Sequence, residues 1–280
     1  MSKTVAILQS NYLPWRGYFD LMSRCDLFII GDVVQYTRRD WRNRNIIKTP
    51  SGPLWLTVPV KETPRSSTAI DEVRVAKPRW ASDHIRTLMH TYRKARAYKS
   101  VSPWLFELLQ TTAEQEELLS RINVRILRAI AERLGIATQI LQSSDIIARD
   151  ALIAIDKNAR TLALCREVGA TCYLSGPAAK VYLDVDSLNA HGIDVAWMSY
   201  DGYRHYPQLW GDFLPQVSIV DLLLNTGDEA AGYLVQTPAA KTEAASARRT
   251  VNRSGRQVQG ADRGCVRRRS DGAQVYATVK

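Results

Sequence analysis

Short apolar runs alternate with helical patterns along most of this chain, and this alternation limits the folds that the chain can adopt. Continuous apolar runs at 4–9, 27–30, 171–174 and 193–198 have the length and composition of buried strands. Amphipathic patterns lie between them, and the clearest covers 114–134, where an apolar side chain recurs at every fourth position. Strands that alternate with helices form parallel sheets covered by helices. The sequence therefore predicts an α/β fold with a largely parallel sheet flanked by helices.

The remaining patterns predict further elements. Helices are expected at 16–24, 80–98 and 158–168, another is expected to begin at Ser102 and Pro103, and strands are expected at 55–60, 73–75 and 138–141. The segment 217–224 is apolar enough to be a helix or a strand. The segment 32–48 is polar and is expected to be a loop.

The composition changes after about Gly227, where small and polar residues and arginines replace any apolar period. We therefore expect an α/β domain over 1–229 and a disordered basic tail over 230–280. The formal net charge of the chain is +10, and residues 231–280 carry +7 of it. Because the excess charge lies in the tail, we expect no nucleic acid to bind the folded body. The tail itself either binds nucleic acid or is a terminal extension without selected structure, which its composition favours.

Composition also bounds the location and the redox chemistry of the chain. No apolar run approaches the roughly 20 residues that span a bilayer, and the N-terminus lacks the apolar region of a signal peptide. A cytoplasmic protein without a membrane span is expected. The four cysteines, Cys25, Cys165, Cys172 and Cys265, lack the spacing of metal ligands, so we expect thiols and no metal site.

The densest chemistry lies in the segment 35–48. It interleaves four arginines and one lysine with aromatic and amide side chains. Guanidinium groups suit phosphate or carboxylate, and aromatic rings offer stacking surfaces. A basic surface loop with a structural tryptophan is the alternative. The candidates for substrate binding here are Gln35, Tyr36, Arg38, Arg39, Trp41, Arg42, Asn43, Arg44 and Lys48.

Two further polar loops follow predicted strands. In open α/β sheets, ligands bind beyond the carboxyl ends of the strands. At 175–177, Ser, Gly and Pro expose backbone N–H groups at the start of a helix, which makes either an anion site or a plain helix cap. The binding candidates in these loops are Asn11, Tyr12, Trp15, Ser175, Gly176 and Lys180.

Parallel strands place their carboxyl ends at one edge of the sheet. The strands that end at Gln9, Ile30 and Leu174 should therefore bring the loops after them together. We predict that Asn11, Asp32 and Ser175 share one crevice, with the segment 38–44 at its rim.

Acid–base groups are scarce in these loops. No Ser-His-Asp or Cys-His pairing can be recognised, so the catalytic candidates are Asp32, Asp40 and His205. His205 lies in an aromatic and polar stretch, 203–211, whose Tyr206 and Gln208 are also binding candidates or simply pack the loop. The scattered histidines His84, His90 and His191 are expected to be structural.

The sequence Trp15-Arg16-Gly17-Tyr18 weakly resembles the HxGH nucleotide-binding turn of class I tRNA synthetases and pantothenate synthetases. Each has a strand, a loop, and then glycine with an aromatic or histidine residue at the start of a helix. Both histidines that would contact ATP phosphates are absent here. The likeness therefore implies a similar fold and gives no support for adenylyl transfer.

Four stretches of the chain resemble the signature blocks of the WbqC-like family, in the family's order. They are 5–15, 36–45, 173–177 and 206–211, and the resemblance covers residues 3 to about 229. Members of this family tend to accompany genes for O-antigen and other surface polysaccharides, and they are suspected to transfer acyl or aminoacyl groups to amino sugars. The family often has two consecutive Asp before Val-Gln, whereas this chain has Asp32-Val33.

The resemblance and the residues together imply a transferase that acts on an amino sugar or a nucleotide sugar, with an acyl or aminoacyl donor. The basic side chains of 38–48 would hold the diphosphate, and Tyr36 or Trp41 would stack on the base. Asn11, Gln35, Asn43 and Gln208 would contact hydroxyls, and Asp32 or Asp40 would accept a proton. A non-catalytic nucleotide- or glycan-binding protein of a biosynthetic complex and an ATP-dependent ligase are the alternatives. No cofactor is identified.

Overall fold

The computed structural model describes residues 2–61, 68–77 and 79–234. Most of the predicted tail therefore lies outside the described residues. The last described element is the 3-10 helix η4 (Gly227–Tyr233), in which Ala230 is buried, and Leu234 after it is buried as well. The folded part of the chain thus extends past the boundary expected at 229, because apolar side chains continue to pack for one more turn.

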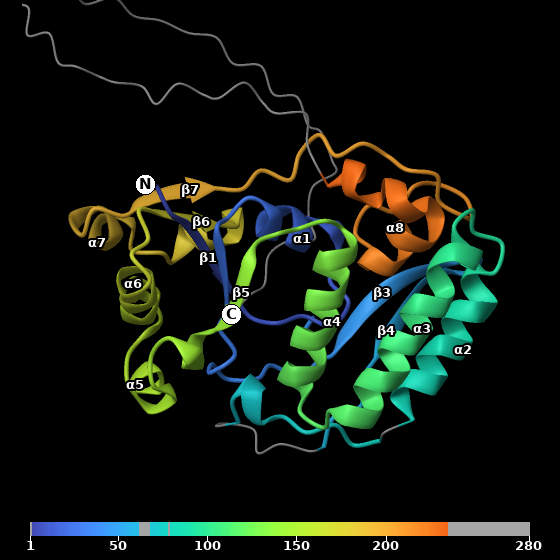
Figure 1. The fold of residues 1–280 in the computed structure, drawn as a ribbon, viewed down its shortest axis with the longest axis horizontal. Helices are drawn as coiled ribbons and strands as arrows, with labels where there is room; N and C mark the ends of the chain where they lie inside the picture. The colour runs from blue at the N-terminus through green and yellow to red at the C-terminus, as the bar shows by residue number, and fades with distance from the viewer. Residues whose placement is uncertain (1, 62–67, 78, 235–280) are drawn as a thin grey trace, which may run out of the picture. The chain divides into compact units, whose positions relative to one another are not determined.

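A five-stranded sheet forms the centre of the fold (Figure 1). Its strands are β1 (Thr4–Leu8), β2 (Leu27–Ile30), β5 (Gln139–Gln142), β6 (Cys172–Ser175) and β7 (Asp194–Trp197), in the order β5-β2-β1-β6-β7. Every neighbouring pair in this sheet is parallel. The predicted α/β class with a largely parallel sheet is confirmed.

Alternate side chains of the sheet enter two separate cores, as the two-residue period of a strand requires. Ala6, Phe28 and Ile30 belong to the larger core, on the face covered by α1 (Arg16–Ser23) and α4 (Leu119–Arg133). Val5, Leu27 and Ile29 belong to the smaller core, on the opposite face. That face is covered by α5 (Arg149–Ile153), α6 (Lys157–Glu167) and α7 (Val185–Ala190) (Figure 1).

The direction of winding reverses beside β1. From β1 the chain moves outward through β2 to β5, and it then returns to the other side of β1 to form β6 and β7. In doubly wound sheets such a reversal separates the loops beyond the two central strands and leaves room for a ligand there. The carboxyl ends of β1 and β6 are therefore the place where this topology favours a binding site.

A second layer of elements extends the larger core. It contains α2 (Trp80–Tyr92), α3 (Tyr98–Gln115), α8 (Ile219–Thr226) and an antiparallel hairpin of β3 (Arg44–Thr49) with β4 (Gly52–Thr57). The short 3-10 helices are η1 (Ile70–Glu72), η2 (Ser143–Asp145), η3 (Pro177–Val181) and η4. The segment 32–48 was predicted to be a loop throughout. This was wrong from Arg44 onward, where β3 begins and its Ile47 is fully buried in the larger core.

Helix boundaries differ from those predicted where tertiary hydrogen bonds redirect the chain. The helix expected over 80–98 ends at Tyr92, and α3 begins at Tyr98, so Pro103 lies inside it. The helix expected from 114 begins at Leu119, whose N–H donates to the Val73 carbonyl. No strand forms at 73–75. Arg74 and Val75 make only isolated bridges, to Leu118 and Val60.

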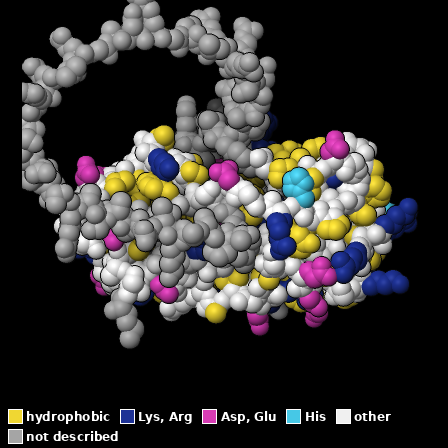
Figure 2. Space-filling view, turned by 90° about the horizontal axis from the view of Figure 1, so that it is seen from above, with side chains coloured by type: hydrophobic (Ala, Val, Ile, Leu, Met, Phe, Trp, Pro, Cys, Tyr) yellow, Lys and Arg dark blue, Asp and Glu magenta, His cyan; other side chains and the backbone are white. Residues whose placement is uncertain are grey.

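Two predictions from composition can be compared with the described residues. Cys25, Cys165 and Cys172 are free thiols, as expected, and Cys265 lies outside the described ranges. Within the described ranges, no helix has the length and apolar character needed to cross a bilayer. On the face seen in Figure 2, basic side chains are interspersed with acidic and hydrophobic ones where the surface is described.

Candidate functional site

The loops that follow β1 and β2 are joined through Asp32. Its Oδ1 accepts a hydrogen bond from the Ser10 backbone N–H at 2.8 Å, and its Oδ2 accepts from the Ser10 hydroxyl at 2.6 Å. The Ser120 hydroxyl of α4 also donates to Oδ2. Asp32 is 3% exposed, and burial raises the pKa of its carboxyl group although these three donors oppose the rise. The residue expected to accept a proton is thus fully occupied in holding two loops and a helix together.

Asn123 of α4 extends this network. Its Nδ2 donates to the Ser10 hydroxyl oxygen at 3.1 Å and to the Arg42 carbonyl at 2.8 Å. Ser10, Ser120 and Asn123 were not predicted as site residues. The apolar period of α4 gives no sign that Ser120 and Asn123 are buried and paired with distant loops. Their presence fixes the backbone of both the β1 loop and the segment before β3.

Arg42 lies against the loop that follows β1. Its Nη1 donates to the Asn11 side-chain oxygen, and its Nη2 donates to Gln9 Oε1 at 3.1 Å. The residue is 8% exposed, and no described carboxylate forms an ion pair with it. Asp32 is close enough for the charge of Arg42 to lower the Asp32 pKa. The predicted proximity of the basic segment to Asn11 and Asp32 is confirmed for Arg42.

The loops after β6 and β7 reach the same edge of the sheet. β6 is the direct neighbour of β1, and it ends at the buried Ser175. A Cβ atom at Gly176 would lie 3.5 Å from the Tyr200 hydroxyl, and the Tyr200 ring centre lies 5.1 Å from that of Trp15. Residues after β1, β6 and β7 therefore meet beside the reversal of the strand order. Asn11 and Asp32 follow β1 and β2, and Ser175 ends β6, so the three lie at one edge of the sheet. That they share one crevice stays a prediction.

Backbone strain is concentrated in these loops. The non-glycine residues with positive φ among those described are Leu13 (44°), Arg39 (58°) and Trp210 (66°). Positive φ is unfavourable for side chains of this size, and such residues gather where function fixes the backbone. Each lies in a different one of the blocks 5–15, 36–45 and 206–211.

Tyr12 was expected to contact a ligand, but the structure places it in the larger core with no exposed surface. Its hydroxyl hydrogen-bonds His84 Nδ1 at 2.8 Å, and His84 Nε2 lies 3.2 Å from the Thr57 carbonyl. Because a carbonyl only accepts, Nε2 carries the proton and Nδ1 accepts from Tyr12. Burial lowers the pKa of His84 to about 4, so the ring is neutral at neutral pH. The structural role expected for His84 agrees with this arrangement.

Three further candidates serve a buried network around Asp221 of α8, which was not predicted. Asp221 accepts hydrogen bonds from the Tyr92 hydroxyl at 2.7 Å, the Tyr206 hydroxyl at 2.8 Å and Gln208 Nε2 at 2.9 Å. Lys48 Nζ donates to Gln208 Oε1 at 3.1 Å and to two backbone carbonyls of the same loop. Tyr206, Gln208 and Lys48 thus fasten that loop to β3 and α8, where a ligand contact was expected.

The other candidates divide into buried and exposed groups. Asn43 and Tyr36 are buried, and Asn43 Nδ2 donates to the Val58 carbonyl at 2.9 Å. Arg44 lies 4.0 Å above the Trp55 ring, which also neighbours Trp41. The exposed candidates are Gln35, Arg38, Arg39, Trp41, Lys180 and His205.

Two catalytic candidates remain, Asp40 and His205. The contacts described for them do not involve the residues that meet at the β1/β6 edge. Asp40 accepts hydrogen bonds from the Thr37 hydroxyl at 2.5 Å and from the Trp41 N–H at 2.7 Å, both within its own turn. His205 stacks on Phe213 with ring centres 4.1 Å apart. In the described part of the chain, no cluster of His, Cys, Asp and Glu is arranged to hold a metal ion.

Gly17 allows the Trp15 ring to cover the start of α1. A Cβ atom at this position would lie 2.3 Å from a Trp15 ring carbon, and real Cβ atoms do not approach that closely. We expect Gly17→Ala to lower the free energy of unfolding by about 1–3 kcal/mol and to displace Trp15. Denaturant unfolding followed by tryptophan fluorescence checks both effects. Gly176→Ala is the control, because its new methyl group meets only ordinary contacts; equal losses in both variants would contradict this account.

Comparison with known proteins identifies relatives over nearly all of the described chain. The sequence profile of the WbqC-like protein family matches residues 9–233. The chain is also 47% identical over 232 residues to "Uncharacterized protein Rv1507c" of Mycobacterium tuberculosis (strain ATCC 25618 / H37Rv), an alignment that covers 83% of this chain and 97% of that protein. No solved structure matches the chain. The matched span contains all the loops that meet at the carboxyl edge of the sheet.

Proposed function

The chain belongs to the WbqC-like protein family, and from this premise we propose that it is a transferase that adds an acyl or aminoacyl group to an amino sugar or a nucleotide sugar. The surface-polysaccharide setting comes from the family resemblance of the sequence blocks. The structural support is the position of Arg42, a buried cation whose partners are neutral, beside the reversal of the strand order. A phosphate group of the substrate would supply a directly bonded anion, which the described hydrogen-bond partners of Arg42 do not provide.

The neighbours of Arg42 suit a sugar nucleotide. Asn11 and Gln9 present amide groups whose other atoms can hydrogen-bond sugar hydroxyls. Trp41 is 36% exposed next to Arg42 in sequence, and its ring is available to stack on a flat base. In the proposed substrate, the diphosphate binds Arg42, the sugar contacts Asn11 and Gln9, and the base stacks on Trp41.

The proposed reaction needs a proton acceptor. The amine nitrogen of the sugar forms a bond to the acyl carbon as the carbon–sulfur bond of a thioester donor breaks, and the nitrogen loses a proton. Asp40 is the candidate that we favour for accepting it, because it lies two residues before Arg42 in the chain and the donors described for it, the Thr37 hydroxyl and the Trp41 N–H, belong to its own turn. Asp32, by contrast, is held by donors from two separate elements.

The decisive experiment is a turnover assay with the purified chain. Nucleotide-linked amino sugars are incubated with acyl and aminoacyl thioesters, and mass spectrometry detects a sugar that has gained the acyl mass. Pyrophosphate release that requires ATP and a free acid would instead support an ATP-dependent ligase. Binding without turnover across the donor set would support a non-catalytic nucleotide-binding protein, a function favoured by the fully occupied carboxyl group of Asp32.

Arg42→Gln tests the binding half of this proposal. The substitution removes the charge, so we expect the affinity for a nucleoside diphosphate to fall by about 1.5–3 kcal/mol, the range for a hydrogen bond to a charged group. Isothermal titration calorimetry measures the change. Arg121→Gln is the control, because Arg121 is exposed on α4 and belongs to none of the predicted binding segments. Unchanged affinity in a folded Arg42→Gln protein would remove Arg42 from the proposed site.

A further inference from the structure

Arg16, the first residue of α1, is a buried cation without an anionic partner. It is 3% exposed, and its Nη1 donates to the Arg204 carbonyl at 2.8 Å. Its Nε is buried and has no hydrogen-bond partner among the described residues. No described carboxylate forms an ion pair with it. An unpaired buried charge strongly opposes folding, so its retention calls for a function.

Three aromatic rings lie close to the Arg16 guanidinium. The group lies 4.4 Å from the ring centre of Tyr203, 5.6 Å from that of Tyr206 and 5.8 Å from that of Phe213. Burial lowers the pKa of Arg16, and the neighbouring Tyr206, Tyr203 and Asp20 offset this only in part. Arg16 also lies at the positive end of the α1 dipole, which has no acidic residue in its first turn. Both features favour an anion at this place.

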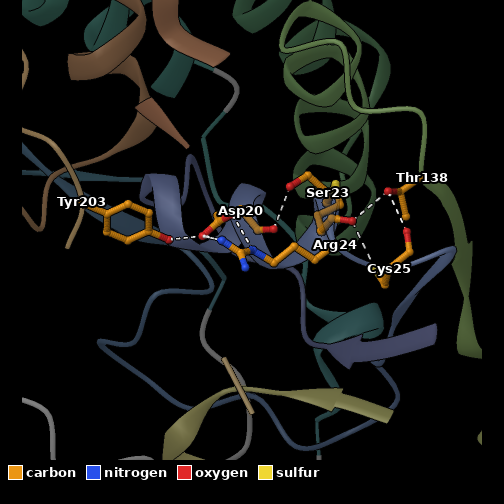
Figure 3. Close-up of polar contacts among 7 residues, drawn as sticks. Asp20, Ser23, Arg24, Cys25, Thr138 and Tyr203 are labelled. Atoms are coloured by element: carbon orange, nitrogen blue, oxygen red, sulfur yellow. Dashed lines mark hydrogen bonds and ion pairs between the residues drawn. The ribbon is translucent and has the colours of Figure 1, made fainter. Parts of the chain in front are cut away.

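The nearest acidic side chain is already engaged. Asp20 is buried in the same helix, and it accepts hydrogen bonds from Arg24 Nε at 2.8 Å and Arg24 Nη2 at 3.3 Å. The Tyr203 hydroxyl donates to it at 2.6 Å from the other side (Figure 3). Asp20 is therefore paired with Arg24, and its charge compensates that of Arg16 only in part.

The edge of the Arg16 guanidinium that has no described partner is the Nε–Nη2 edge. Nε and Nη2 point in the same direction from a guanidinium and together hold the two oxygens of a carboxylate or phosphate. Arg24 uses this edge for Asp20, and Arg149 uses it for Asp71 at 2.9 and 3.2 Å. The same edge of Arg16 has no partner in the described residues.

Other arginines with an unpaired Nε differ from Arg16 in a way that matters. Arg133 forms an ion pair with Asp228, and Arg44 is only partly buried and donates Nη2 to the Arg39 carbonyl. Among the described residues, Arg16 alone combines deep burial, an unpaired Nε and the lack of a carboxylate. We propose that its Nε–Nη2 edge binds an oxyanion of a small-molecule ligand, a carboxylate or phosphate group, at the carboxyl edge of β1. The described contacts of Arg16 differ from those of Arg42, and the proposal does not depend on the proposed transferase activity.

The test uses the full chain with inorganic phosphate and with acetate as probes, against chloride at matched ionic strength. We expect one of the two oxyanions to bind the wild-type chain, and we expect Arg16→Gln to weaken that binding about tenfold or more. Preference for phosphate or for acetate identifies which oxyanion the ligand carries. Arg149→Gln is the matched control, because the same edge of Arg149 already holds Asp71; it should bind the oxyanion as the wild type does.

A second measurement keeps the proposal testable if Arg16→Gln does not fold. The Arg Nε–H signals of the wild-type chain are followed by NMR during the titration, with Arg16→Lys to identify the signal of Arg16. The Arg16 signal should move on addition of the oxyanion, and the Arg149 signal should not. The proposal is overturned if neither oxyanion binds better than chloride, if Arg16→Gln binds as the wild type does, or if the Arg16 signal stays in place.

Discussion

Replacing Asp32 with asparagine is expected to lower the free energy of unfolding by about 2–4 kcal/mol, because a buried acceptor of three hydrogen bonds becomes a group with only one acceptor atom. The Ser10 N–H and the hydroxyls of Ser10 and Ser120 all donate to this carboxyl group, and none can turn to water. Urea denaturation of the wild-type and variant chains measures the loss.

Asp40→Asn provides the matched control for that substitution. Asp40 is also a candidate proton acceptor and also accepts hydrogen bonds, but it is partly exposed and its donors lie in its own turn. Loss of such a local contact near the surface should cost at most about 1 kcal/mol. If both variants were equally stable, Asp32 would not hold the loops together as the structure indicates.

Acidification is expected to destabilise the protein through His84. Its pKa falls from about 6.5 in the unfolded chain to about 4 in the fold, so the unfolded chain binds more protons between these values. The neutral His84 ring makes its full contribution to the free energy of unfolding above pH 6.5. This contribution is lost as the pH falls through 4. Chemical denaturation at a series of pH values should show a loss of about 3 kcal/mol from this residue.

Two variants isolate the contribution of His84 from those of the carboxyl groups. Burial raises the pKa of Asp32 and Asp221, so their effects run in the opposite direction, with stability lost as the pH rises. His84→Gln keeps a donor for the Thr57 carbonyl and cannot titrate, so its stability curve should lack the His84 part. His90→Gln, an exposed position of the same helix, should keep the wild-type curve. A wild-type curve in His84→Gln would contradict the assignment.

The sequence was sufficient to predict the edge of the sheet at which the candidate residues meet. Continuous apolar runs identify parallel strands, and parallel strands place the loops after β1, β2 and β6 on one side whatever their order. The contact of Arg42 with Asn11 agrees with the predicted place of the segment 38–44 near this edge. The order of strands did not follow, because nothing in an apolar run specifies its neighbour.

The sequence does not show which candidate residues face a ligand and which are buried and stabilise the fold. Tyr12 and Lys48 look the same in sequence as residues that face a ligand, but their partners are distant in the chain. Tyr12 bonds His84, 72 residues away, and Lys48 bonds Gln208, 160 residues away. Asp221 lies in a nearly continuous apolar helix and gave no signal of the hydroxyl groups that surround it. The sequence gives no sign of the role of Arg16, because only the fold shows that no carboxylate forms an ion pair with it among the described residues.

The position of β1 between β2 and β6 has a consequence for the newly made chain. β1 leaves the ribosome before the other strands of its sheet, but one of its neighbours begins only at Cys172. At about 5–20 residues per second, synthesis of the intervening chain takes on the order of 10–30 seconds. During that interval one side of β1 has no partner strand, and exposed strand edges favour aggregation. A chain interrupted before β6 would have three of the five strands and would lack the β1/β6 edge, so the proposed site cannot form until β6 has been made.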